Sequence, residues 1–175
     1  SHSNLYLDTT IQNWPAKFDV DDIEQPLRPV NNMKADLQAG ITSLRCLGDR
    51  SFMDVHCRKA VEEDRLPGPT LKIATRGIRA THGHGLIGYP FDGVDTVRRV
   101  VRGNIKAGAD FIKLFLTGTV PADPIVCYPS ADEINAVIDE AHRAGLPVTA
   151  HCIGGSGFDL ALDLGIDCIE HGYFL

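Results

Sequence analysis

Three side chains that could bind a metal occur at apolar runs in the second half of the chain. Lys113 lies inside such a run, His151 directly follows one, and His171 comes two positions after the end of another. Imidazole nitrogens are good ligands for zinc and other borderline metals. A lysine cannot ligate while it is protonated, but burial among apolar residues lowers its pKa and yields a free amine. That amine can react with CO2 to give an anionic carbamate, whose two oxygens can bridge two cations.

Each of these residues, taken alone, has an ordinary structural explanation. A lysine within a strand usually lies at a sheet edge, and a histidine after an apolar run is often a core residue with its hydrogen bonds satisfied. If these structural explanations held throughout, a polar residue would have to occur by chance in or just after three successive runs. Two metals roughly 3.5–4 Å apart can share a hydroxide and polarise a scissile carbonyl. The pattern therefore favours metal-assisted hydrolysis.

The elements that must position these side chains form a regular alternation. The helices are expected at residues 33–39, 51–65, 94–107, 130–144 and 158–164, and the strands at residues 41–46, 70–74, 110–116, 146–150 and 166–169. Glycine follows most of the helices, as is usual at a helix C′ position. Ser130 and Glu133 have the spacing of a capping box. Alternating elements of this kind predict a parallel sheet that is buried on both faces.

This alternation fits either an open doubly wound sheet or a closed barrel. No glycine-rich phosphate loop follows the first run, which disfavours the dinucleotide-binding open sheet. In a (β/α)8 TIM barrel the catalytic groups lie at the C-terminal ends of the strands. Because polar residues recur at these ends, we expect the α/β fold to be such a barrel.

Three motifs together resemble those of a known family. Residues 109–113 (Ala-Asp-Phe-Ile-Lys), 148–151 (Val-Thr-Ala-His) and 169–172 (Ile-Glu-His-Gly) are similar to the strand-four, strand-five and strand-six motifs of the amidohydrolase superfamily. Residues 40–45 and 83–85 resemble its imidazolonepropionase-related, dipeptidase-like branch. The resemblance runs over nearly the whole chain.

The resemblance implies a metal centre. Lys113 would be the carboxylated lysine that bridges two divalent metals, with zinc as the expected metal. His151 and His171 would bind the second metal. His2 would be the second histidine of the family's first-strand His-x-His pair, whose two side chains share one side of a strand.

The resemblance also implies substrate contacts and a reaction. His84 would act as a catalytic residue that contacts the substrate carbonyl, and Tyr128 would anchor a substrate carboxylate. The expected reaction is cleavage of an amide-type C–N bond by a metal-bridging hydroxide. A dipeptide, an N-acyl amino acid or a cyclic amide would fit, and the first two move ahead if Tyr128 holds a carboxylate.

The domain expected from the resemblance is a partial catalytic barrel. The family's general acid/base is an aspartate at the end of strand eight, whereas residues 1–175 match the end of strand 1 through strand 6. Strands 7 and 8 and the N-terminal part, with the first histidine of the pair, would be absent. We therefore expect the parent protein to be the enzyme, and this segment alone to be inactive.

Three other functions are compatible with the sequence. Within the superfamily, the rival is a mononuclear deaminase or imidazolone-type hydrolase, in which the strand-four residue bridges no metals. From another class, a barrel lyase or isomerase would act on phosphorylated substrates. The third alternative is a non-catalytic truncated barrel that serves as a binding module.

The composition of the chain indicates which classes of binding partner and which compartment to expect. The formal net charge is -6, the charges are interspersed, and no basic stripe occurs, which argues against a nucleic-acid partner. No apolar run approaches the roughly 20 residues of a membrane helix. Five cysteines without close spacing favour a reducing compartment, with the cytoplasm as the expected one. A small-molecule substrate is expected, and a homo-oligomer remains open.

Overall fold

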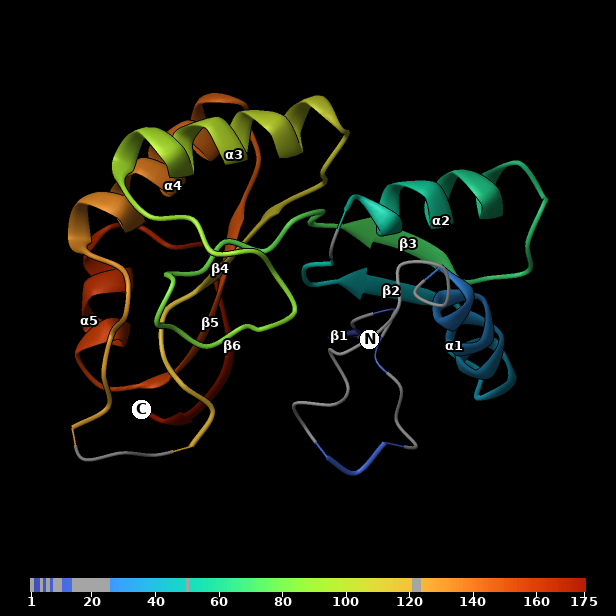
Figure 1. The fold of residues 1–175 in the computed structure, drawn as a ribbon, viewed down its shortest axis with the longest axis horizontal. Coiled ribbons are helices and arrows are strands. Elements are labelled where there is room, and N and C mark those ends of the chain that lie inside the picture. Colours follow the sequence, from blue (N-terminus) through green and yellow to red (C-terminus); the bar gives the residue numbers. More distant parts are fainter. Residues whose placement is uncertain are drawn as a thin grey trace.

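Parallel strands and helices alternate strictly along the part of the chain that the computed structural model describes, which comprises residues 2–3, 5, 7, 11–13, 26–49, 51–120 and 124–175 (Figure 1). The strands are β1 (His2–Ser3), β2 (Ser43–Cys46), β3 (Thr70–Ile73), β4 (Ile112–Phe115), β5 (Val148–Gly154) and β6 (Cys168–Phe174). The helices are α1 (Leu27–Gln38), α2 (Met53–Glu62), α3 (Val94–Lys106), α4 (Ala131–Arg143) and α5 (Ser156–Asp163). The predicted alternation is confirmed.

The strands form two parallel ladders in the orders β1-β2-β3 and β4-β5-β6. Between β3 and β4 the ladder is replaced by single contacts. The backbone N–H of Asp110 donates to Ile73 O at 2.8 Å, and Ile78 forms an isolated parallel bridge with Leu114. The two ladders therefore meet edge to edge, and the predicted parallel sheet is confirmed.

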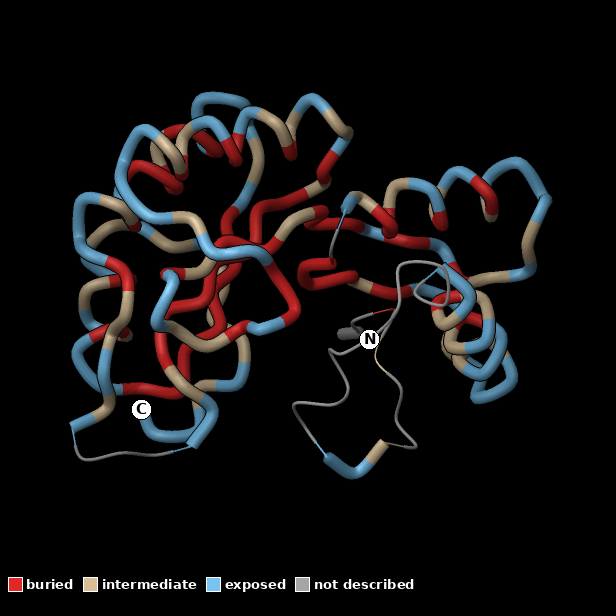
Figure 2. The backbone as a smooth tube through the Cα atoms, in the orientation of Figure 1, coloured by how far each residue is buried: buried red, intermediate tan, exposed pale blue. Residues whose placement is uncertain are grey.

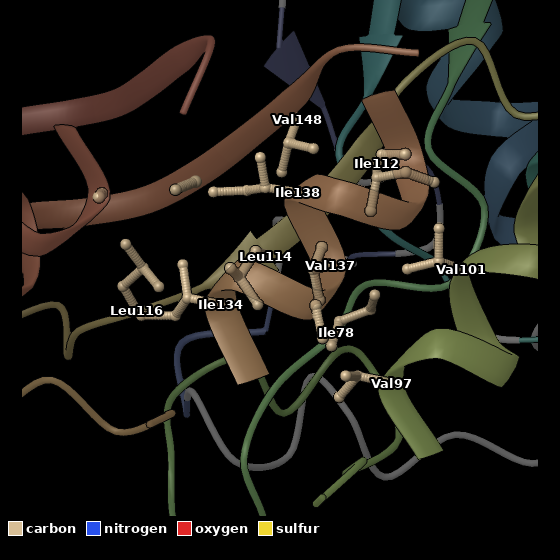
Figure 3. Packing of buried hydrophobic residues seen from close by; sticks show 14 of the residues in the cluster. Ile78, Val97, Val101, Ile112, Leu114, Leu116, Ile134, Val137, Ile138 and Val148 are labelled. Carbon is tan, nitrogen blue, oxygen red and sulfur yellow. The ribbon is translucent and has the colours of Figure 1, made fainter. Parts of the chain in front are cut away.

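The larger core lies between the second ladder and helices α3 and α4, which run along the same side of β4 and β5 (Figure 1). Side chains alternate across a strand, so Ile112 and Leu114 of β4 enter this core. It also contains Val97 and Val101 of α3, Ile134, Val137 and Ile138 of α4, and Val148 of β5 (Figure 3). The intervening residues of β4 face the opposite side, where the predicted site lies.

A second core lies under α1 and α2. Met33 of α1 and Cys57 of α2 pack with Leu44 of β2 and Ile73 of β3. Buried residues concentrate along β4 and β5, whereas β6 has intermediate and exposed residues and the outer faces of the helices are exposed (Figure 2). Among the described residues, no helix has both the length and the apolar character needed to cross a bilayer.

Several element boundaries differ from the prediction. Helix α1 begins at Leu27, six positions before the predicted residue 33, and includes Pro29 in its first turn. Proline is tolerated there because the first N–H groups of a helix have no partner within the helix. The predicted capping box is confirmed: Ser130 Oγ accepts from the N–H of Glu133, and Glu133 Oε2 accepts from the N–H of Ser130.

An ion-pair network clamps α3 to α4 and gives a testable expectation. Glu140 accepts from Arg98 at 3.0 Å and from Arg102 at 2.7 Å, and these hydrogen bonds lower the pKa of Glu140 to about 2. Because the pKa is lower in the folded state, the stabilisation is present above the unfolded value of about 4.5 and is lost as the pH falls toward 2. We expect Glu140→Gln to lower the free energy of unfolding by about 1 kcal/mol at pH 7.

Denaturant unfolding of the wild type and of Glu140→Gln at pH 7 and pH 2.5 checks this expectation. The difference between the two proteins should shrink at the lower pH. A difference that is the same at both pH values would contradict the assigned role of the carboxylate. Glu62→Gln is the matched control, since the Glu62 side chain is exposed on α2 and approaches Arg58 only at 3.9 Å.

Candidate metal centre and active site

Strand β4 places Lys113 on the face opposite the larger core. The side chain is 1% exposed, and its Nζ has no hydrogen-bond partner in the structure as described. Nζ lies 5.1 Å from the centroid of the Phe115 ring, on the same face of β4. Burial lowers the pKa of Lys113 to about 7, with a nearby Glu170 opposing the shift and Arg45 adding to it. A substantial fraction of this buried amine, about half at pH 7, therefore lacks its proton near neutral pH.

Strand β5 places His151 beside this lysine's strand. Phe115 and His151 are register partners, and His151 is 4% exposed. Its Nε2 lies 3.0 Å from Gly118 O, so Nε2 must carry the proton that it donates to the carbonyl. Burial lowers the pKa of His151 to about 3. The ring is therefore neutral at physiological pH, and its Nδ1 carries the free lone pair.

His171 reaches the same region through an irregular backbone. Ile169 packs against the larger core, so regular alternation would turn His171 toward that core as well. Instead, His171 has φ 83°, and the following Gly172 has φ 57°. The His171 ring lies 4.5 Å from the His151 ring between centroids. A left-handed backbone at a non-glycine residue is uncommon and costs free energy.

His84 approaches from the long connection between β3 and α3. Its ring centroid lies 4.6 Å from that of His151 and 5.8 Å from that of Phe115. Burial, and then the positive charge of Lys113, lower the pKa of His84 to about 4. Arg79 shapes this connection by donating to the carbonyl oxygens of Gly83 and Gly88, among others.

The structure thus brings together four of the six predicted site residues. They are Lys113, His151, His171 and His84. Tyr128 lies at their margin: a methyl group added at Gly83 would be 3.2 Å from Tyr128 Cβ, and one added at Gly118 would be 3.4 Å from its hydroxyl oxygen. His2 pairs with Arg45 through the backbone of β1, and its side chain lies outside the described residues.

Two of these residues do not end their strands as predicted. His151 and His171 lie inside β5 and β6, which continue to Gly154 and Phe174. Among the described residues, no three His, Cys, Asp or Glu side chains converge closely enough to hold one ion. The arrangement is a row of imidazole rings, of which those of His84 and His151 are neutral, beside an amine without a hydrogen-bond partner. It fits a site completed by a further anionic ligand.

Sequence reasoning missed three polar residues next to this cluster. Glu170 Oε1 accepts from Arg45 Nη1 and from Thr149 Oγ1, both at 2.8 Å. A glutamate directly before a predicted metal ligand was a signal in the sequence. Its partner Arg45 could not be identified, because it lies 125 positions away.

A family model described as the amidohydrolase family matches residues 23–175. The chain belongs to the amidohydrolase family. An ochratoxinase from Aspergillus niger is 30% identical to it over 164 residues, covering 77% of this chain and 34% of that protein. The chain therefore spans about a third of the length of this curated relative.

Solved amidohydrolase-family structures superimpose on almost all of the chain. A prolidase complexed with N-methylphosphonate-L-proline gives a TM-score of 0.85 at 29% identity, covering 98% of this chain and 46% of that one. A Xaa-Pro dipeptidase with bound methionine in its active site gives a TM-score of 0.81 at 26% identity, covering 99% of this chain and 47% of that one. The predicted barrel fold, with its first six strands, is confirmed. Membership of this amidohydrolase family favours a hydrolase over a lyase or isomerase.

Proposed function

We propose that this chain provides most of the metal site of a hydrolase that cleaves the amide C–N bond of a dipeptide or an N-acyl amino acid. The proposal rests mainly on one observation: the amine of Lys113 is fully buried, has no hydrogen-bond partner and lies beside a row of imidazole rings. A buried donor without a partner costs about 1–3 kcal/mol, and such a cost is typical of a functional group.

Carboxylation would give the Lys113 amine its partner. The lone pair of the neutral amine attacks the carbon of CO2, so that an N–C bond forms as one C=O π bond opens, and one proton leaves the nitrogen for solvent. The resulting carbamate shares one negative charge between two oxygens that could hold two divalent cations, and zinc suits the imidazoles around them. His2, His151 and His171 would complete the ligand set, and the low pKa of His151 keeps its ring neutral, as ligation requires.

When bound, such cations activate a water molecule for attack and polarise the substrate carbonyl. The protein would contribute to the same step through His84. Its neutral ring can donate a hydrogen bond to the carbonyl oxygen as negative charge develops there. The Tyr128 hydroxyl would hold the substrate carboxylate at the margin of the site.

The substrate class rests on the relatives. The prolidase structure contains an N-phosphonylated proline, and the Xaa-Pro dipeptidase structure contains methionine in its active site. Both ligands carry an amino-acid carboxylate. We therefore place dipeptides and N-acyl amino acids before cyclic amides as small-molecule substrates of the whole protein.

Metal content and turnover of the full-length enzyme test this function. We expect two zinc ions per complete chain in the wild type, and loss of at least one ion in His151→Ala and in His171→Ala. Turnover of a dipeptide panel should fall about a thousand-fold or more, because the metals supply several kcal/mol of the catalysis. His56→Ala, an exposed histidine on α2, is the matched control and should change neither quantity.

Two results would count against this function. Stoichiometric metal with unchanged turnover in either histidine variant would refute the ligand assignment. One metal per wild-type chain, with turnover that survives replacement of Lys113, would favour the mononuclear deaminase or imidazolone-type hydrolase.

A further inference from the structure

A polar network crosses the interior between the two ladders. Glu170 of β6 accepts from Arg45 of β2 and from Thr149 of β5, each at 2.8 Å. The Cys168 thiol sulfur lies farther from the same oxygen, at 3.7 Å. The Arg45 guanidinium also lies 4.8 Å from the centroid of the Phe111 ring. One carboxylate thus joins strands of both ladders.

Each residue of this network stands beside a proposed metal ligand in the sheet register. The register pairs are Arg45 with His2, Thr149 with Lys113, and Glu170 with His151. Glu170 also directly precedes His171 in the chain. The network therefore contacts every strand that carries a proposed ligand, either directly or through one backbone pairing.

The composition of this interior layer is unusual for a barrel. Branched aliphatic side chains dominate the interior layers of (β/α)8 barrels, and they would fill the space without a desolvation cost. Glu170 is instead a charged side chain that is 12% exposed, and its partner Arg45 is 41% exposed. An ion pair withdrawn from water at one partner is weak evidence for stability, and the best-attested use of such pairs is to fix one arrangement of the elements that they join.

We propose that Arg45, Glu170 and Thr149 are positioning residues that hold the ligand-bearing strands in the register that retains metal. This inference rests on the proposed function. None of the three is assigned a contact with substrate. Directional hydrogen bonds from Thr149 and Arg45 fix the side chain of Glu170 and, with it, the start of the irregular turn at His171.

Isosteric variants of Thr149 in the full-length, zinc-loaded enzyme test the proposal. Thr149→Val removes only the hydroxyl, whereas Thr149→Ser keeps it. We expect zinc release into excess chelator to be about 10–100-fold faster in Thr149→Val, as for other residues that support metal ligands. Thr149→Ser should release zinc at close to the wild-type rate. Asp139→Asn, which breaks the peripheral 2.6 Å pair with Arg98, is the control.

A second variant and a second measurement separate positioning from general stability. Glu170→Gln should also accelerate zinc release at least ten-fold, and thermal unfolding of each metal-free variant shows whether it folds. If Thr149→Val and Glu170→Gln both fold and both retain zinc as the wild type does, the proposal is overturned. If His151→Ala still loses metal in the same assay, the proposed function stands without the network; if it does not, the function itself fails.

Discussion

Lys113→Met is expected to abolish turnover and, at the same time, to make the metal-free protein more stable. Methionine fills a similar volume and needs no hydrogen bond, whereas the lysine amine is buried without a partner. Removing an unsatisfied buried donor should raise the free energy of unfolding by about 1–3 kcal/mol. Turnover should fall about a thousand-fold or more, because no carbamate can form. Denaturant unfolding in chelator and dipeptide turnover measure these two effects, and metal analysis shows whether the variant still holds metal.

The pH dependence of the Lys113→Met effect provides a further check. The pKa of Lys113 is about 7 in the folded protein and about 10.4 in an unfolded chain. Between these values the unfolded state binds more protons, so the stability of the metal-free wild type rises with pH. The advantage of Lys113→Met should therefore be greatest below pH 7 and should shrink toward pH 10.

The control for this experiment is Lys72→Met. Lys72 is an exposed lysine on β3 that pairs with Asp110 at 2.9 Å. Its replacement should change stability by less than about 1 kcal/mol and leave turnover unchanged. A Lys113→Met protein that keeps two metals, or one that is less stable than the wild type without metal, would show that the buried amine has been misassigned.

Gly85→Ala should disrupt the site by steric pressure alone. Gly85 has φ 98°, and a methyl group added there would lie 2.7 Å from Cγ of Phe115 and 2.8 and 2.9 Å from its two Cδ atoms. The Phe115 ring packs against both His84 and Lys113. We expect a loss of about 2–3 kcal/mol of stability from overpacking and backbone strain and at least a ten-fold fall in kcat.

Gly93→Ala separates the steric effect from the backbone effect. Gly93 has φ 84°, close to that of Gly85, but a methyl group added there meets nothing within 4 Å. This variant should lose only about 1–3 kcal/mol from the strained backbone at φ 84° and ψ 143° and retain its kcat. Equal losses of kcat in the two variants would exclude the contact with Phe115 as the cause.

Much of the architecture could be predicted because it depends on local patterns. The apolar periodicity of residues 94–107 fixed the helix that is observed as α3, and Ser130 with Glu133 marked the start of α4. The start of α1 was missed because Pro29 in a first turn looks like a helix breaker. The ends of β5 and β6 were missed because glycines within a strand look like its boundary.

The candidate site was only partly accessible from the sequence. The burial of Lys113 followed from its apolar neighbours and is found in the structure. The ring contact between His84 and His151 depends on a long connection whose path Arg79 fixes, and no periodicity encodes that path. The pairing of Arg45 with Glu170 depends on strand register between distant segments.

The left-handed backbone at His171 has a consequence for directed evolution. Glycine accepts that conformation at little cost because it has no Cβ, whereas at histidine the conformation costs free energy. A library of the full-length protein screened for heat resistance alone should therefore enrich glycine at position 171. A library screened for turnover should keep histidine there, so the two selections would diverge at this codon.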